Sequence, residues 1–226
     1  MRSDLVFVSK LVVATRNKGK AAEFRTLLAP LGIEVLSLLE AGGAVPEVDE
    51  DRETFAGNAE KKARAAAEAL GLPALADDSG LCVDALGGEP GVRSARYAGE
   101  PSSDERNNAK LLRELAAARE AGGATSGGGG DVALSPARFV CALALYDPAT
   151  GETVRAEGSC EGVIVPEPRG ESGFGYDPLF FVPELGKTFA EMTEEEKNRI
   201  SHRGRALAQL RSELERMSGG NGGGAF

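Results

Sequence analysis

Histidine and cysteine are scarce in this sequence, which holds one histidine and three cysteines among its 226 residues. A single histidine, His202, is too few for a zinc site built from cysteine and histidine, and it argues against a Ser-His-Asp triad. The cysteines, Cys82, Cys141 and Cys160, are widely spaced and form no Cys-x-x-Cys motif. An odd, scattered set of this kind predicts reduced, mostly buried thiols in a cytosolic compartment.

Long apolar runs and an excess of basic residues are also missing. No apolar stretch is long enough to span a bilayer, and residues 1–10 contain too short an apolar core for a signal peptide. Acidic residues outnumber basic ones by 35 to 26, and the net charge of -9 argues against a nucleic-acid polymer as the main partner. A single nucleotide needs only a local cluster of lysine and arginine. We therefore expect a soluble, cytoplasmic protein without a membrane partner.

The alternation of apolar segments and polar turns predicts a mixed α/β fold. We expect strands over residues 10–15, 33–38, 74–76, 81–86, 139–146, 153–158 and 162–165. We expect helices from the polar loop 16–20 to about residue 28, from Thr54 to before Gly71, over about 103–120, from Thr193 to about 200, and from Ser201 onward. Strands and helices alternate early and hairpins come late, so the sheet should be mixed.

Two segments rich in glycine stand apart from this pattern. Residues 122–131 read as a flexible surface loop within the domain, because glycine and serine dominate them. Residues 218–226 read as a disordered tail for the same reason.

Two adjacent carboxylates, Asp77 and Asp78, follow the apolar run 72–76 and precede Ser79 and Gly80. Charges at the end of a buried strand are unfavourable unless a cation pairs with them, which points to a metal ion or a cationic side chain in a cleft. A surface turn is the alternative, since Asp, Ser and Gly are common turn residues. Taken alone, these four residues favour the turn.

A polar loop at residues 15–20 joins the first expected strand to the first expected helix. Backbone N–H groups at a helix start bind anions, and Thr15, Asn17 and Lys20 add hydrogen bonds and a positive charge. The Gly-x-x-x-x-Gly-Lys-Ser/Thr spacing of a nucleotide-binding phosphate loop is absent. An ordinary polar turn is the alternative, but the lysines and glycine beside the helix start favour phosphate binding.

The helix that begins at Thr54 carries Asn58 and Lys62 on one face, because residues four apart are neighbours on a helix. Taken alone, this pair predicts solvated surface. The preceding loop, residues 47–51, contains four acids. They are either solvated or supply a ligand for Mg²⁺, which favours one or two carboxylates together with phosphate oxygens.

Two further segments have the chemistry for binding a nucleobase. Residues 172–178 place Phe174 and Tyr176 around glycines and before Asp177. Aromatic rings stack on bases and a carboxylate accepts from a base edge, although a tight turn explains the same residues. Lys197 and the pair His202 and Arg203 provide donors that suit a base carbonyl, while a single histidine is more often structural.

Taken together and in this order, these segments resemble the Ham1/inosine triphosphatase family. Its members are pyrophosphatases that act on deaminated purine nucleoside triphosphates. The resemblance spans residues 10 to about 214 and is most specific at 75–81, 90–97, 173–178 and 200–204.

The resemblance implies an elongated, twisted mixed sheet with flanking helices and two lobes around a central nucleotide cleft. One domain would cover residues 10–217, with an N-terminal extension at 1–9 and a Gly-rich insertion at about 122–135. The implied reaction is Mg²⁺-dependent hydrolysis of ITP, dITP and XTP to the monophosphate and pyrophosphate, carried out by a homodimer that cleanses the nucleotide pool.

The family pattern also implies residue roles. Asp78 would be the proton acceptor and, with Glu50, a metal ligand; Asp49 is the second choice beside Glu50. The triphosphate would contact Thr15, Arg16, Asn17, Lys18, Gly19 and Lys20, and Ser79 would be a substrate contact. From their chemistry we also expect Asn58 and Lys62 to bind the substrate, with Lys20 and Lys62 neutralising the leaving pyrophosphate. The base would contact Phe174, Gly175, Tyr176, Asp177, Lys197, His202 and Arg203.

Two positions depart from the family pattern, which has Gly at Arg16 and Glu at Gly57. These departures keep open a nucleotide-binding sensor without catalysis. A further alternative is a pyrophosphatase of related fold for modified pyrimidine or methylated nucleotides.

Overall fold

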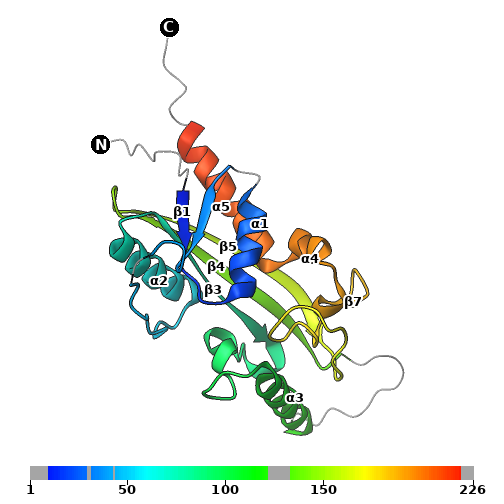
Figure 1. Cartoon of the computed structure of the whole chain (residues 1–226). Coiled ribbons are helices and arrows are strands. Elements are labelled where there is room, and N and C mark those ends of the chain that lie inside the picture. The colour runs from blue at the N-terminus through cyan, green and yellow to red at the C-terminus, as the bar shows by residue number, and fades with distance from the viewer. Residues whose placement is uncertain (1–9, 30–31, 43, 122–132, 220–226) are drawn as a thin grey trace. The chain divides into compact units, whose positions relative to one another are not determined.

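The computed structural model describes residues 10–29, 32–42, 44–121 and 133–219 (Figure 1). The expected extension 1–9, the loop 122–131 and nearly all of the expected tail lie outside the described residues. Within the described part, every helix falls short of the length and apolar character that a membrane span needs.

The described residues form a mixed α/β fold, as predicted. The strands are β1 Lys10–Val13, β2 Glu34–Ser37, β3 Ala74–Val83, β4 Ser135–Asp147, β5 Glu152–Ile164, β6 Phe180–Val182 and β7 Lys187–Thr188. The α-helices are α1 Lys18–Leu28, α2 Phe55–Leu70, α3 Asp104–Ala121, α4 Glu194–Ile200 and α5 His202–Gly219. Short 3₁₀ helices cover Asp84–Leu86, Gly91–Arg96 and Phe189–Glu191.

The seven strands pair in the order β2-β1-β3-β4-β5-β6-β7. Strand β1 is parallel to β2 and β3, whereas β6 is antiparallel to β5 and β7, so the sheet is mixed. The chain divides into two compact units, which we describe separately. The first contains the residues up to Asp78, Cys141–Gly158 and those from His202 onward, and the second contains Ser79–Val140 and Ser159–Ser201.

The first unit has an apolar core on each face of its strands. Successive side chains of a strand point to opposite faces, so Leu11 and Val13 pack with α1 and α5, while Val12 packs with the alanines of α2. Figure 1 shows α1 and α2 on different sides of β1 and β3. Burial on both faces explains why β1 is a continuous apolar run rather than an alternating one.

Helix α2 begins and ends where its sequence predicts. The Thr54 side chain accepts a hydrogen bond from the Gly57 N–H at the start. Gly71 ends the helix with φ 65°, a left-handed conformation that glycine adopts without a Cβ clash. The alanines on its inner face are completely buried, which lets the helix pack closely on the sheet.

The second unit is built around a cluster of three aromatic rings. The centroid of Phe180 lies 4.7 Å from that of Phe139 and 4.8 Å from that of Phe189. Leucines of α3 and β3 pack against the same cluster. Helix α3 is therefore fastened to this unit through its apolar face, which contains Leu111 and Leu115.

Two predicted breaks in strands are wrong. The segments 74–76 and 81–86 form one strand, β3, up to Val83, and residues 84–86 leave it as a 3₁₀ helix. The segments 153–158 and 162–165 likewise form one strand, β5, which ends at Ile164. Acidic and glycine residues signal turns in isolation. Within these strands, however, Asp77 and Asp78 pair with Lys20 and Asn58, and Gly158 and Gly162 lie close to the main chain of neighbouring segments.

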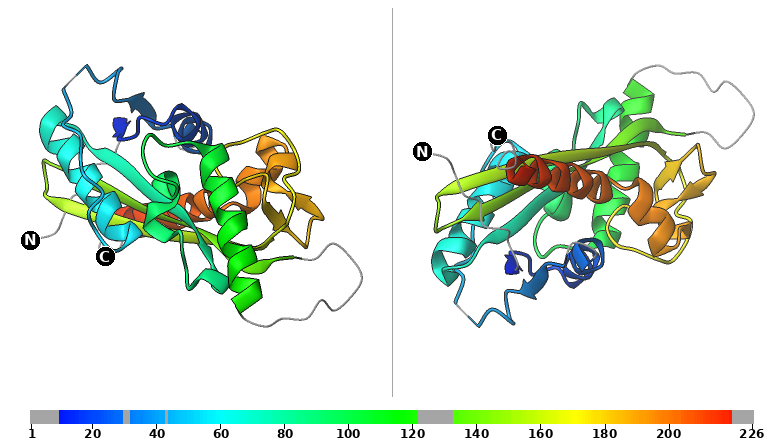
Figure 2. Two further views of the ribbon diagram at one scale, coloured as in Figure 1. Left: turned by 90° about the horizontal axis from the view of Figure 1, so that it is seen from below. Right: turned by 90° about the horizontal axis from the view of Figure 1, so that it is seen from above.

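Gly158 is such a residue, because α5 lies along the end of the β4–β5 hairpin in the first unit (Figure 2). A Cβ at Gly158 would lie 2.3 Å from the His202 carbonyl oxygen and 2.4 Å from the Ala206 nitrogen. Gly158→Ala should therefore push the first turn of α5 away and destabilise the protein by about 1–3 kcal/mol in urea unfolding. Glu157→Ala, an exposed change on the same strand, is the control, and equal midpoints for the two variants would contradict this prediction.

Candidate active site

Strand β3 carries Asp77 and Asp78 inside the fold, so the expectation of a surface turn at residues 77–80 is wrong. Their side chains are 1% and 7% exposed, respectively. Because successive side chains alternate, Asp77 continues the face of Leu75, which packs with α1 and α5. Asp78 continues the face of Ala76, which packs with α2. The two acids therefore have different neighbours and different chemistry.

Asp77 belongs to a buried network of charges. Its Oδ2 lies 2.9 Å from Lys20 Nζ and 3.5 Å from Arg203 Nη2. Arg203 also pairs through Nη1 with Glu23 of α1. Burial by itself would raise the pKa of Asp77, but Lys20, then Arg203 and Lys62, outweigh it and hold the pKa well below its usual range. Asp77 is thus an anion that pairs with two cations, Lys20 and Arg203.

Asp78 is held by groups of α2. Asn58 Nδ2 donates to Asp78 Oδ2 at 3.0 Å, and Lys62 Nζ lies 3.5 Å from Oδ1. Burial raises the pKa of Asp78, and Glu50 raises it further, against the opposing effect of Lys62. A carboxylate whose pKa is raised is a better proton acceptor than an ordinary aspartate.

Lys62 lies between two carboxylates. Its Nζ is 2.7 Å from Glu50 Oε1 as well as 3.5 Å from Asp78 Oδ1. Burial alone would lower the pKa of Lys62, but Asp78, Asp77 and Glu50 together raise it, so the side chain remains an ammonium ion. The negative charges of Glu50 and Asp78 thus already converge on one cation in this structure.

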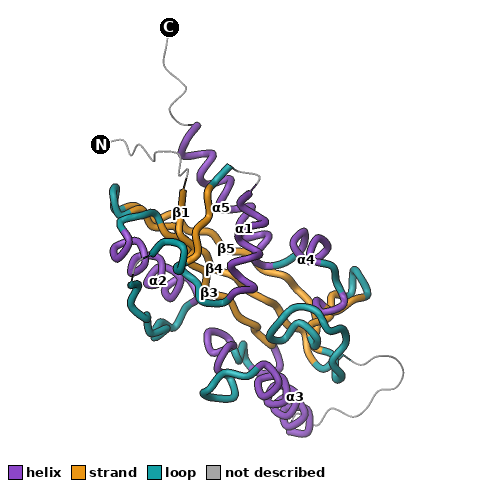
Figure 3. The backbone as a smooth tube through the Cα atoms, in the orientation of Figure 1, coloured by secondary structure: helices purple, strands orange, loops and turns teal. Residues whose placement is uncertain are grey.

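Asn58 is completely buried, so the expectation that the Asn58 and Lys62 pair forms solvated surface is wrong. Asn58 Oδ1 accepts from the Arg52 N–H at 2.9 Å, and Nδ2 donates to the Arg52 carbonyl at 3.3 Å as well as to Asp78. The acidic loop before α2 runs beside that helix (Figure 3). The side-chain amide of Asn58 therefore binds the main chain of this loop at Arg52 and also holds the Asp78 carboxylate.

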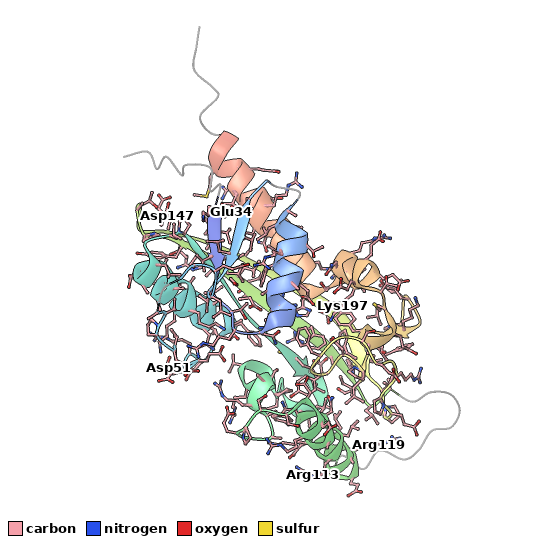
Figure 4. All side chains as sticks on the ribbon, in the orientation of Figure 1. Glu34, Asp51, Arg113, Arg119, Asp147 and Lys197 are labelled. Atoms are coloured by element: carbon pink, nitrogen blue, oxygen red, sulfur yellow. The ribbon has the colours of Figure 1, made fainter. Side chains whose placement is uncertain are left out.

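The donor set suits Mg²⁺, because Glu50 and Asp78 are hard oxygen ligands that share a neighbour. The neighbouring Asp49 is exposed, and its backbone oxygen accepts from Lys61 Nζ at 2.9 Å. Lys61 also pairs at 2.9 Å with Asp51, which Figure 4 labels on the same loop. The described residues contain no group of three or more His, Cys, Asp or Glu that could hold a metal by themselves. Two carboxylates would leave further positions for substrate oxygens and water.

The loop 15–17 leads into helix α1, as predicted, and the start of the helix is capped. Asn17 is the N-cap, and its Oδ1 accepts from the Lys20 N–H at 3.1 Å, while the Asn17 N–H donates to Thr15 Oγ1 at 3.2 Å. Gly19 is exposed in the first turn. Arg16 extends outward, with an Nη1 atom 3.7 Å from Glu47 Oε1. The Lys18 side chain is not among the described side chains.

The segment around Phe174 lies in the second unit and is held by Asp177. Asp177 Oδ2 accepts from the Phe174 N–H at 3.0 Å and lies 2.7 Å from Lys197 Nζ. Lys197, labelled on α4 in Figure 4, also lies 5.1 Å from the centroid of the Phe174 ring. A Cβ at Gly173, where φ is 84°, would lie 2.1 Å from Asp177 Oδ2, so this turn requires glycine.

The two aromatic residues of this segment differ in exposure. Tyr176 is buried in the core of the second unit, and its hydroxyl donates to the Ser94 carbonyl at 2.8 Å. Phe174 is only partly buried. Phe174, and not Tyr176, therefore presents a ring that a ligand can reach. Ser79, the other predicted contact in this unit, is half-buried in β3 directly after Asp78.

The predicted site residues thus fall into two sets, one in each unit. His202 and Arg203 begin α5 and belong with the loop 15–20, Asn58, Lys62 and Asp78 in the first unit. Lys197 belongs with Ser79 and residues 174–177 in the second. Sequence analysis missed Glu23, Asp104 and Asn108, which contact members of these sets. The helical spacing of Asp104 and Asn108 is the signal that places both on one face.

Residues 11–213 match the model of the Ham1 family. A dITP/XTP pyrophosphatase of Geobacillus kaustophilus is 51% identical over 215 residues, which are 95% of this chain and 98% of the relative. A dITP/XTP pyrophosphatase of Desulforamulus reducens is 54% identical over 208 residues, which are 92% of this chain and 96% of that relative. The solved structure of a HAM1 protein from Coxiella burnetii has a TM-score of 0.77 at 42% identity and covers 92% of this chain and 98% of that one. The chain belongs to the Ham1 family.

Proposed function

We propose that this protein is a pyrophosphatase of deaminated purine nucleotides, which hydrolyses dITP, XTP and ITP to the monophosphate and pyrophosphate. The observation that carries the proposal is the setting of Asp78, a buried carboxylate of raised pKa between Asn58 and Lys62. Relatives of about half-identical sequence over nearly the whole chain are named dITP/XTP pyrophosphatases.

Glu50 and Asp78 would hold Mg²⁺ together with oxygens of the substrate. Bound there, the metal ion would neutralise charge on the triphosphate and favour attack at phosphorus. The exposure of Asp49 and the contact between Glu50 and Lys62 support Glu50 as the second carboxylate.

Asp78 would accept a proton from the water that attacks the α-phosphorus. The bond between the α-phosphorus and the oxygen that bridges to the β-phosphorus breaks, and pyrophosphate leaves with that oxygen. Lys20 and Lys62 would neutralise its charge, with Lys20 held by Asp77 and Lys62 held between Glu50 and Asp78. Asn58 would keep the Asp78 carboxylate in one orientation, which contributes to catalysis by positioning.

The base would contact the second unit. The partly buried Phe174 ring offers a stacking surface, and Lys197 beside it offers a charged donor. A donor directed at O6 favours hypoxanthine and xanthine over adenine, which carries an amino group there.

The homodimer and the cytoplasmic location stay predictions.

Product analysis tests this proposal. With Mg²⁺ we expect dITP to give dIMP and pyrophosphate in equal amounts, little turnover of ATP or GTP, and no turnover after chelation of the metal. Chromatography of the nucleotides, with phosphate assayed before and after inorganic pyrophosphatase, distinguishes the outcomes. Release of orthophosphate alone would refute the proposal. Turnover confined to pyrimidine or methylated nucleotides would favour the related-fold enzyme, and binding without turnover would favour the sensor.

A further inference from the structure

Helix α3 holds both main-chain groups of Gly175 with its side chains. Asp104 Oδ2 accepts from the Gly175 N–H at 2.7 Å, and Asn108 Nδ2 donates to the Gly175 carbonyl at 2.9 Å. The two residues are four apart, so they lie on one face of the first turns of α3. Side chains that satisfy both the N–H and the C=O of a single loop residue restrict its rotation and fix its position.

Gly175 has a left-handed backbone conformation with open space beside its Cα. Its φ is 64°, a conformation open to glycine, and a Cβ there would meet no atom within 4 Å. This position therefore favours glycine because of its positive φ, and not because a side chain would clash with a neighbour. The main chain on both sides is held as well, by Asp177 at Phe174 and through the hydroxyl of Tyr176.

The helix that holds Gly175 is itself anchored. The buried Asn107 accepts from the Ala98 N–H at 2.8 Å and donates to the Ala95 carbonyl at 3.0 Å. This ties the first turn of α3 to the segment that also provides the Ser94 carbonyl for Tyr176. Asp104 and Asn108 therefore project from a fixed element, as a residue that orients a loop must.

We infer that Asp104 and Asn108 are positioning residues for base recognition, which set the orientation of the Phe174 ring by holding Gly175. The inference rests on the proposed function, because it assigns the Phe174 ring to the purine base. The inference also distinguishes base binding from triphosphate binding. Asp104 and Asn108 hold Gly175, the neighbour of Phe174, in the second unit, whereas Lys20 and Lys62, the proposed contacts of the leaving pyrophosphate, belong to the first.

Kinetics and product inhibition test the inference. Asp104→Ala and Asn108→Ala should each raise KM for dITP about tenfold, which is the effect expected of one lost hydrogen bond, with kcat changed less than about twofold. Competitive inhibition by IMP should weaken by the same factor, whereas inhibition by pyrophosphate, which has no base, should stay unchanged. Asp104→Asn keeps an acceptor oxygen and should restore a KM near that of the unaltered protein.

Glu105→Ala is the matched control, because it removes the neighbouring exposed carboxylate from the same helical turn. It should leave KM and both inhibition constants unchanged. Equal weakening of inhibition by IMP and by pyrophosphate, or an unchanged KM in both alanine variants, would overturn the inference while leaving the proposed function intact. An unaltered protein that fails to hydrolyse dITP would overturn the proposed function and this inference with it.

Discussion

Asp78→Asn should abolish pyrophosphate release while leaving the protein folded. The substitution removes the proposed proton acceptor and one of two metal ligands, and proton transfer by a positioned side chain typically contributes about 10²–10⁴-fold to a rate. Losing the metal ligand as well places the expected loss at the upper end of this range. Turnover of dITP under saturating Mg²⁺ is the measurement.

The fold should tolerate this change for an electrostatic reason. A raised pKa in the folded protein means that the ionised Asp78 is less favourable in the fold than in the unfolded chain. Neutralising it at neutral pH therefore removes an unfavourable charge, and the asparagine oxygen can still accept from Asn58. Asp49→Asn, an exposed change in the acidic loop, should retain activity. A near-normal rate in Asp78→Asn would remove Asp78 from its assigned role.

Arg203→Met should have the largest effect on stability. The Arg203 side chain is 2% exposed and pairs with both Asp77 and Glu23. Methionine fills part of the space but removes the guanidinium from both Glu23 and Asp77, while Asp77 keeps its pair with Lys20. Removing one partner of a buried ion pair destabilises proteins by about 3–5 kcal/mol, and we expect a loss of this size in urea unfolding.

A surface pair of the same chemistry provides the comparison. Arg199 is 74% exposed and lies 3.4 Å from Glu195, also on α4. Exposed pairs of this kind contribute little, so Arg199→Met should leave the unfolding midpoint almost unchanged. Arg203→Lys keeps a positive charge, so its unfolding midpoint should lie between those of Arg203→Met and Arg199→Met. If Arg203→Met and Arg199→Met unfolded at the same urea concentration, the network around Asp77 would have no structural importance.

Local signals predicted the elements that depend on neighbouring residues. Thr54 and Gly71 bound α2 correctly, because an N-cap and a left-handed C-cap act within one turn. The motif residues indicated a cluster of carboxylate, amide and lysine side chains, and the structure brings Asn58 and Lys62 to Asp78. The catalytic and binding roles assigned to them stay predictions. The sequence did not identify Asp104 and Asn108 as site residues, because the sequence of α3 does not indicate which loop its polar face contacts.

The residue types and their order decide the fold class, the caps of α2 and the kind of chemistry available. Only the folded chain shows that Asp77 and Asp78 have different neighbours. The two side chains point to opposite faces of the sheet because successive side chains alternate along a strand. This alternation requires that residues 77–80 continue β3 and do not form a turn. Lys20 and Arg203 neutralise Asp77 on one face, and Asn58 and Lys62 hold Asp78 on the other. The sequence of residues 77–80 is compatible with a surface turn and with a buried strand. These long-range partners stabilise the strand.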